Sequence, residues 1–407
     1  MASEIRKVFM KRLFHAALLV LTLLLPAACK AQTAAEDPCV FIGEEIALPD
    51  GWHPLAAVCP YAGEHGIAAL CSDGEKYALF SYDPDAEEGA WTRTEGDFPK
   101  AVSLIGGTVT EDAVFLVSAE EGFGAFTLTR YGTDGAAEKT VSLDTFFGAV
   151  DPMRFGIYAV AATDRGVCAL SGGEKIVCLD AEMNLSFSVS CGGAALGLAF
   201  DSAGDLVALF PGEDCFRQLD GKTGAVKKTI SGAARAKKLF RSADGGICFT
   251  DSVGVKRFSE KGEHSPMLDY LNSNLTAQTT SVLGVCHEDA VLLLRGGAES
   301  RLCLYRRSDE PVSWGSTLEI AVTQESSVLS NAIRVFSARH GDIHITLTDY
   351  SQYNTKDDWQ AGQKRLALDL TTGVYKPDLI YAPASDIEMQ TAIRENFYVD
   401  LIPRIVV

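Results

Sequence analysis

The sequence predicts a multidomain protein, in which an all-β six-bladed β-propeller over residues 41–315 is followed by an α/β lobe over residues 316–407. Two observations support this expectation. Short apolar stretches and polar turns recur at intervals of about 40 to 50 residues in the first region, as in propeller blades. In the second region, strands alternate with amphipathic helical segments, which is typical of a parallel α/β sheet.

Length and charge limit the possible functions. The chain has 407 residues, enough for two or three domains, and its 47% hydrophobic content excludes a disordered protein. The net charge of −18 argues against a nucleic-acid partner, because a phosphate backbone must be met with Lys and Arg.

Residues 1–29 have the pattern of a signal peptide. Basic residues precede an apolar run over residues 16–25, which is too short to span a bilayer. The run ends in Pro26-Ala27-Ala28-Cys29, which resembles a bacterial lipobox except at Pro26. The resemblance implies a lipid anchor on Cys29 and a place at the extracellular face of the cell membrane. The alternative is an ordinary secretory signal that is cut later, for instance after Ala35. Residues 30–40 form a small, polar linker.

Six strand ends, each followed by an acidic or glycine-rich turn, mark the expected blades. Another apolar strand precedes each of them, for example at residues 66–70 and 112–116. One blade cannot bury both of its faces alone, which gives a structural reason for the repetition. The repeats resemble those of six-bladed NHL or Kelch-like propellers, without a diagnostic motif of either. The strand ends are Tyr82, Tyr131, Leu179, Leu219, Phe258 and Tyr305.

The last repeat lacks an outer strand of its own. Candidate outer strands follow the other five strand ends, but the segment after Tyr305 is short and contains Pro311, which cannot donate to a ladder. Residues 41–48 could pair with the last blade instead, closing the ring and removing an exposed edge. The five candidate outer strands are residues 91–94, 139–143, 185–189, 226–230 and 266–270.

The α/β lobe is expected to contain three strands, at residues 317–322, 343–348 and 379–382. A helix that starts at Ser326 or Ser327 would place Leu329, Ile333 and Phe336 on one face. A second helix is expected to start at Asp357 or Asp358, with Trp359 and Leu366 on its buried face, and to end at Gly373. Ser385 and Glu388 fit a capping box for a third helix.

Four segments of this lobe resemble the N-terminal lobe of extracellular solute-binding protein family 1, the sugar-type receptors of bacterial ABC importers. They are residues 318–322, 349–351, 373–380 and 398–403. The resemblance implies a periplasmic-binding-protein-like lobe that is incomplete, because such receptors need a second lobe and a hinge. It also implies a small-molecule solute, with a sugar expected, and an ABC permease as partner.

Ligands of open α/β sheets bind beyond the carboxyl ends of the strands. The two tyrosines after the second strand have flat rings that suit the apolar face of a sugar, although packing on the propeller explains them equally well. No catalytic residue, metal ligand or cofactor is expected. The ligand-binding candidates are Thr323, Gln324, Asp349, Tyr350, Tyr353, Pro383, Ser385 and Asp386.

Several other groups of residues are expected to be structural. His340 and His344 do not share a helix face, so a metal site is not expected there. The 11 cysteines include no Cys-x-x-Cys pair and, apart from Cys29, are expected to be mainly buried free thiols. Residues 83–89 are expected to form a solvated turn, and residues 192–197 a loop between blades. A local basic cluster is expected on a solvated face; it consists of Arg235, Lys237, Lys238 and Arg241.

Taken together, these features predict a lipid-anchored extracellular solute-binding protein that is not an enzyme and captures a carbohydrate for an ABC importer. The alternative is a surface β-propeller that acts as an interaction or sensor module without transport function. A third possibility, an enzyme with its active site on the propeller, has only the versatility of the fold behind it.

Overall fold

The structure is a computed structural model of the chain, and the residues it describes belong to the compact unit Cys39–Val407. The unit Met1–Pro38, with Cys29, lies outside the described residues. Pro383, Ser385, Asp386 and the turn at residues 83–89 also lie outside them. The described residues are 40–62, 66–82, 91–99, 104–119, 126–148, 156–233, 235–273, 275, 280–287, 290–295, 301–308, 315–324, 326–340, 342–354 and 358–382.

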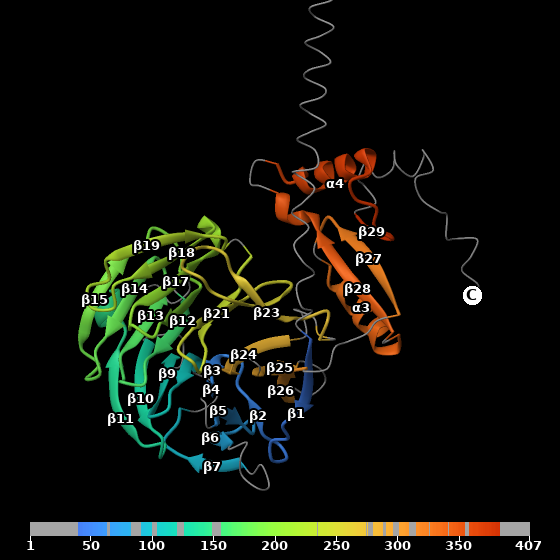
Figure 1. Cartoon of the computed structure of the whole chain (residues 1–407). Coiled ribbons are helices and arrows are strands. Elements are labelled where there is room, and N and C mark those ends of the chain that lie inside the picture. Colours follow the sequence, from blue (N-terminus) through green and yellow to red (C-terminus); the bar gives the residue numbers. More distant parts are fainter. Residues whose placement is uncertain are drawn as a thin grey trace, which may run out of the picture. The chain divides into compact units, whose positions relative to one another are not determined.

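The first three sheets follow one another along the chain, each with antiparallel main strands (Figure 1). The first consists of β5 (Ile67–Ser72), β6 (Tyr77–Tyr82) and β7 (Trp91–Glu95), with β2 (His53–Pro54) and β4 (Tyr61–Ala62) both paired to β5. The second consists of β8 (Leu104–Val109), β9 (Ala113–Ala119), β10 (Phe126–Gly132) and β11 (Ala137–Ser142), with β3 (Val58–Cys59) parallel to β8. The third consists of β12 (Ile157–Ala162), β13 (Cys168–Gly172), β14 (Lys175–Leu179) and β15 (Leu185–Ser190).

Three further sheets complete the propeller. The fourth consists of β16 (Gly197–Phe200), β17 (Leu206–Phe210), β18 (Cys215–Leu219) and β19 (Val226–Ser231). The fifth consists of β20 (Lys238–Arg241), β21 (Ile247–Thr250), β22 (Gly254–Arg257) and β23 (Ser265–Asp269). The sixth consists of β24 (Thr280–His287), β25 (Ala290–Arg295), β26 (Arg301–Arg307) and β1 (Phe41–Glu45).

These sheets form a closed ring, because the inner strands of neighbouring sheets are in contact all the way around. Strand β5 contacts β8, and the contacts continue through β12, β16, β20 and β24, which returns to β4 of the first sheet. The prediction of a six-bladed β-propeller is therefore confirmed. The expected strand ends fall at or within two residues of the ends of the third strand of each blade.

Strand β1 closes the ring, as predicted. It pairs antiparallel with β26 as the outermost strand of the sixth sheet, from Phe41 opposite Arg307 to Glu45 opposite Cys303. The Arg301 guanidinium lies 2.8 Å from the Glu45 carboxylate and adds an exposed ion pair to this seam. The first strand of the propeller thus belongs to its last blade, which leaves β26 with a partner on both sides.

The core lies between neighbouring blades. Phe115 and Leu128 of the second blade pack with Leu170 of the third in one cluster of fully buried side chains. Phe200 and Phe210 of the fourth blade pack with Ile176 of the third in the next cluster. Each blade therefore completes the core of its neighbour, which is why one blade alone is not stable. Two short helices accompany the sheets, α2 (Asp144–Phe147) and η1 (Pro211–Glu213).

After the propeller, the chain forms a parallel three-stranded sheet in the order β28-β27-β29. The elements alternate as predicted. They are β27 (Ser316–Val322), α3 (Ser327–Arg339), β28 (Ile343–Asp349), η2 (Tyr350–Tyr353), α4 (Ala361–Thr372) and β29 (Leu379–Tyr381). Ser326 caps α3, because its hydroxyl accepts a hydrogen bond from the backbone N–H of Leu329. Three strands do not identify a periplasmic-binding-protein-like lobe, so that part of the predicted fold is not shown.

The second helix of this segment differs from the prediction. Helix α4 starts at Ala361, several residues after the expected start at Asp357 or Asp358. Trp359 consequently lies in the turn before the helix and is 69% exposed, so the prediction that it is buried is wrong. Leu366 is fully buried, as expected. Among the described residues, no helix is both long enough and apolar enough to cross a membrane.

Candidate functional site

The inner strands of the propeller enclose a central channel with two cavities. The larger has a volume of about 460 Å³ and is lined by the first residues of β8, β12, β16, β20 and β24, together with Ala56, Ala57 and Cys59. The smaller, about 130 Å³, is lined by later residues of the same strands. The inner strands run in one direction through the ring, so the two cavities lie at successive levels of one channel.

Small residues are frequent in the lining of the larger cavity. They include Gly106, Gly107, Ala159 and Gly197. Gly197 also allows close approach of the next blade, because a Cβ at this position would lie 2.9 Å from the Cβ of Leu239. Glycine at Gly107 and Gly197 thus permits close packing of the strands and blades that surround the cavity.

Two lysines bring positive charge to the larger cavity. Lys237 and Lys238 lie immediately before and at the start of β20, and both line the cavity. The Lys238 ammonium donates to the backbone carbonyl of Val282 at 3.0 Å. In the smaller cavity, the Arg241 guanidinium lies 3.0 Å from the Asp164 carboxylate. The basic cluster was expected on a solvated face, and Lys237 is indeed exposed; the structure adds that Lys237, Lys238 and Arg241 line the cavities of the channel.

A buried carboxylate accompanies the lysines. Asp251 is 4% exposed, and its Oδ1 accepts hydrogen bonds from the backbone N–H groups of Val253 at 2.8 Å and Gly254 at 2.9 Å. Its Oδ2 lies 2.7 Å from the Lys256 ammonium. Tyr270 lines the same cavity, and burial, followed by the negative charge of Asp251, raises the pKa of its phenol well above the usual range. The carboxylate is thus satisfied by its own turn and by Lys256.

A buried hydroxyl and two exposed apolar side chains complete the lining. Thr280 is 7% exposed, and its Oγ1 has no hydrogen-bond partner among the residues that the structure describes. Tyr158 and Leu196 are 44% and 43% exposed and line the larger cavity from the third and fourth blades. The cavity therefore combines two cations, an unsatisfied hydroxyl and apolar surface, which is the mixture that small-molecule sites use.

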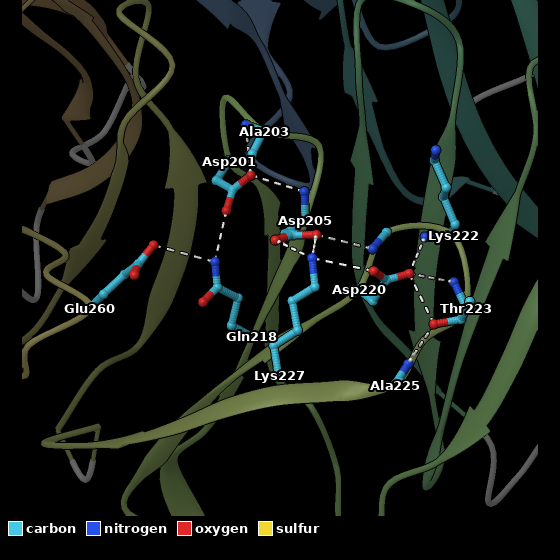
Figure 2. A network of polar contacts seen from close by, with 11 residues as sticks. Asp201, Ala203, Asp205, Gln218, Asp220, Lys222, Thr223, Ala225, Lys227 and Glu260 are labelled. Atoms are coloured by element: carbon cyan, nitrogen blue, oxygen red, sulfur yellow. Dashed lines mark hydrogen bonds and ion pairs between the residues drawn. The ribbon is translucent and has the colours of Figure 1, made fainter.

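A group of aspartates in the fourth blade invites comparison with a cation site but is structural (Figure 2). The Lys227 ammonium lies 2.7 Å from Asp205 and 3.2 Å from Asp220, between the two carboxylates. Asp220 also accepts from the Thr223 hydroxyl and from backbone N–H groups, and these hydrogen bonds, first that of Thr223, hold its pKa far below the usual value. No group of three or more potential metal ligands occurs in the part of the chain that is described.

The same network ties two blades together. Gln218 Nε2 donates to Asp201 at 3.0 Å within the fourth blade, and lies 3.4 Å from Glu260 in the turn after β22 of the fifth blade (Figure 2). Asp201 Oδ1 in turn accepts from the backbone N–H groups of Ala203 and Asp205, both at 2.9 Å. These side chains fix turns and one blade boundary, which accounts for their arrangement without a ligand.

The structure brings two of the predicted ligand-binding residues to one edge of the parallel sheet. Asp349 pairs in register with Val322, the residue before Thr323. Thr323 is 2% exposed, and its Oγ1 has no partner among the described residues, whereas Gln324 is exposed. Asp349 accepts from the backbone N–H of Ser351 at 2.8 Å and forms an ion pair with Arg235. Their adjacency follows from the parallel register, and their role in binding stays a prediction.

Tyr350 has a different place from the one predicted. It is 4% exposed and packs with Ala321 and Leu366, and its hydroxyl donates to Asp369 at 2.9 Å. Burial, with the hydrogen bond to Asp369, raises the pKa of its phenol well above the ordinary value. The ring therefore offers no exposed face to a sugar in this structure. Tyr353 is 45% exposed, with the Arg365 guanidinium 5.7 Å from its ring centroid.

The cysteines whose side chains the structure describes are free thiols, as predicted, and most of them are buried. Burial raises the pKa of Cys71 and Cys178 to about 12, so neither is a ready nucleophile. Cys59 and Cys191 are partly exposed, and Cys59 lines both cavities of the channel. Cys59 is therefore a natural position for a chemical probe of the channel.

Sequence reasoning missed the channel residues, although a signal for them exists. Ala57, Gly106, Leu196 and Lys237 each stand just before or near the start of an inner strand. Counting the blade repeat back from the strand ends to these positions would have placed Lys237 and Lys238 at the channel.

No family model matches the sequence, and no curated protein matches it. Solved structures similar to this chain include a protein assigned as a gluconolactonase, with 16% identity, a TM-score of 0.44, and coverage of 68% of this chain and 97% of the other. A catalytically inactive virginiamycin B lyase from Staphylococcus aureus with quinupristin shows 9% identity, a TM-score of 0.43, and coverage of 66% and 100%. A luciferin-regenerating enzyme shows 11% identity, a TM-score of 0.42, and coverage of 66% and 96%.

These likenesses concern architecture and transfer no activity to this chain. They do correct one expectation from the sequence, that the chain is not an enzyme. The similar structures include a lyase and a luciferin-regenerating enzyme. The prediction that the chain is not an enzyme, which rested on the absence of a convincing catalytic motif, is therefore wrong, since a propeller fold does not exclude enzymatic activity.

Proposed function

We propose that this chain acts as a β-propeller binding module whose ligand site is the larger cavity of the central channel. The observation that carries the proposal is that Lys237, Lys238 and Thr280 together line a cavity of about 460 Å³, and that the Thr280 hydroxyl has no hydrogen-bond partner among the described residues. Cavities of this size that place convergent polar groups beside apolar surface are a usual form of small-molecule sites. This function corresponds to the interaction or sensor module that the sequence left as its alternative.

A bulky substitution in the lining of the larger cavity tests this function. Ala57 is exposed and lines the cavity, so Ala57→Trp should fill the site without disturbing the backbone hydrogen bond from Gly107 to the carbonyl of Ala57. Ala203→Trp is the matched control, because Ala203 is exposed in the turn between β16 and β17, outside the cavity lining. Ligand-observed NMR against a small-molecule library should give binders of the wild type and of Ala203→Trp that Ala57→Trp does not bind.

Cys59 provides a second readout at the same site. Its thiol is partly exposed and lines the cavity, so a bound ligand should slow its alkylation by iodoacetamide, measured by peptide mass spectrometry. Alkylation of the partly exposed Cys191, which does not line the cavity, should not change. Mass spectrometry of the ligand after incubation shows in the same experiment whether it is converted. The proposal fails if no compound binds, or if the binders are unaffected by Ala57→Trp.

A second candidate function rests on the α/β segment, and we propose it as solute capture for an ABC permease. It is supported by the adjacency of Thr323 and Asp349 at the carboxyl ends of β27 and β28, and by the buried hydroxyl of Thr323, which has no partner among the described residues. Calorimetric titration with oligosaccharides should then show binding that Thr323→Val weakens. Thr346→Val, at an exposed position in β28, is the control and should bind normally. No heat with any sugar would exclude this function.

The membrane setting is a separate proposal, supported by the short apolar run that ends at Cys29. We propose that Cys29 carries a lipid and holds the protein at the extracellular face of the membrane. Cys29→Ala should release the protein into the medium, as judged by cell fractionation and immunoblotting. Membrane retention of Cys29→Ala at the wild-type level would refute the anchor.

A further inference from the structure

We propose that the larger cavity takes a small organic anion with an apolar body, its anionic group beside Lys237, Lys238 and the hydroxyl of Thr280. The inference rests on the proposed function and names the ligand class of the same site. Three independent features of the cavity support it: its charge, its unsatisfied hydroxyl and its exposed apolar surface.

The charge of the lining is positive in a chain of net charge −18. The lining includes Lys237 and Lys238 as cations and Asp251 as its carboxylate. Asp251 is compensated by two backbone N–H groups and by Lys256 at 2.7 Å. The lining therefore carries two ammonium groups against one carboxylate that is already paired, and low-dielectric walls of a cavity strengthen the resulting positive field. An anion is attracted there, and a cation is repelled.

Thr280 points to an oxygen acceptor on the ligand. Its side chain is more than nine-tenths buried, lines the cavity, and has no hydrogen-bond partner among the described residues. Buried hydroxyl groups are nearly always hydrogen-bonded, because an unmade hydrogen bond costs free energy. A carboxylate oxygen in the cavity would accept from this hydroxyl and from the lysine ammonium groups, and charge-assisted hydrogen bonds are the strong ones.

The apolar part of the ligand is indicated by Tyr158 and Leu196. Both are large, more than 40% exposed and part of the cavity lining, on neighbouring blades. A flat apolar group can stack on the Tyr158 ring and contact Leu196, which removes apolar surface from water. An inorganic anion would leave this surface unused. The site therefore fits a molecule that has an anionic group at one end and an apolar group at the other.

Matched probes separate these contributions. Naphthylacetate, naphthylethanol and naphthylethylamine share one apolar body and differ in charge, and acetate carries the charge without the body. Calorimetry or ligand-observed NMR with the full-length protein should show the highest affinity for naphthylacetate, a lower affinity for naphthylethanol and the lowest of the three for naphthylethylamine, with acetate binding only weakly. Raising the salt concentration from about 0.05 M to about 0.5 M should lower the affinity for naphthylacetate much more than the affinity for naphthylethanol.

Variants assign the binding to named residues. Lys237→Met and Lys238→Met should each lower the affinity for naphthylacetate about ten-fold and leave the affinity for naphthylethanol almost unchanged. Tyr158→Ala should weaken both compounds, and Lys222→Met, at an exposed lysine of the β18–β19 turn, should weaken neither. Thermal melting of each variant shows that it is folded, and Lys237→Met keeps the test valid if Lys238→Met does not fold.

The outcomes distinguish this inference from the function on which it rests. If naphthylacetate and naphthylethanol bind with equal affinity and Ala57→Trp abolishes both, the ligand is not selected for negative charge. That result overturns the inference of an anionic ligand but keeps the proposed ligand site in the channel. Binding of naphthylacetate that survives Ala57→Trp overturns both, because the site then lies elsewhere. Failure of every probe overturns the anion class, and failure of the library screen as well overturns the proposed function.

Discussion

The ammonium group of Lys238 lies 3.0 Å from the carbonyl oxygen of Val282 and donates a hydrogen bond to it. Lys238 is the first residue of β20 and Val282 belongs to β24, so the bond joins the inner strands of the fifth and sixth blades. Both residues line the larger cavity. One side chain therefore contributes to the closure of the ring and to the positive field of the candidate ligand site.

The contribution of this bond to stability can be measured. Lys238→Met keeps most of the side-chain volume but removes the donor, so we expect the free energy of unfolding to fall by about 1 kcal/mol. Lys222→Met, at an exposed turn lysine, should change it by less than about 0.5 kcal/mol. Urea denaturation followed by tryptophan fluorescence measures both. Equal stability of the two variants would show that the hydrogen bond to Val282 contributes nothing.

Removal of β1 should open the ring. Deletion of residues 41–46 removes the strand paired to β26 and the hydrogen bond from Ile46 to Leu302, and exposes β26 as an unprotected edge. We expect a lower melting temperature and concentration-dependent association, detected by light scattering coupled to size-exclusion chromatography. Glu44→Gln, at an exposed position of β1, is the control and should remain monodisperse like the wild type. A deletion variant that behaves like this control would contradict the closing role of β1.

Gly221 should not tolerate a side chain. A Cβ at this position would lie 1.8 Å from the carbonyl oxygen of Gly204, which belongs to the neighbouring turn of the same blade. Gly221→Ala should therefore lower the free energy of unfolding by about 1–3 kcal/mol, because backbone has to move. A Cβ at Gly212 would have no atom within 4 Å, so Gly212→Ala should be nearly neutral. Thermal melting of the pair gives the comparison, and a stable Gly221→Ala would disprove the close approach.

Stability should fall in mildly acidic solution because of His264. Its ring packs against Phe216, Phe249 and Phe258, and Nδ1 accepts from the backbone N–H of Ser259 at 3.1 Å. Burial lowers the pKa of His264, so the folded state disfavours the charged imidazole more than the unfolded state does. The unfolded state then binds more protons, and stability falls as the pH drops below about 6.5, the ordinary pKa of histidine.

Replacement of His264 tests this assignment. Urea unfolding between about pH 7 and about pH 5 should show a smaller loss of stability for His264→Phe than for the wild type, whatever the stability of the variant at neutral pH. Burial also lowers the pKa of His344, so part of the pH dependence should remain. His53→Asn, at an exposed position, is the control and should retain the full dependence. If the free energy of unfolding of His264→Phe depends on pH as strongly as that of the wild type, His264 is not the source of the pH dependence.

The sequence by itself determined the architecture of the propeller. Strand alternation and turn residues are local properties, so the strand ends at Tyr82, Leu179 and Leu219 coincide with the ends of β6, β14 and β18. Ring closure by β1 was also predictable, because a blade without an outer strand must find one elsewhere. The parallel order of β27, β28 and β29 followed from the alternation of strands with helices.

Only the tertiary structure decided which residues meet at the channel and which are buried in the α/β segment. Lys238 and Thr280 are separated along the chain and lie on different blades, so only the closed ring brings them to one cavity. The place of Trp359 depends on where α4 starts, because the helical period assigns faces only from a known first residue. Tyr350 lies in η2 and is buried by packing with Ala321 and Leu366, and its hydroxyl donates a hydrogen bond to Asp369 of α4. Such contacts arise from packing between elements, which local periodicity does not encode.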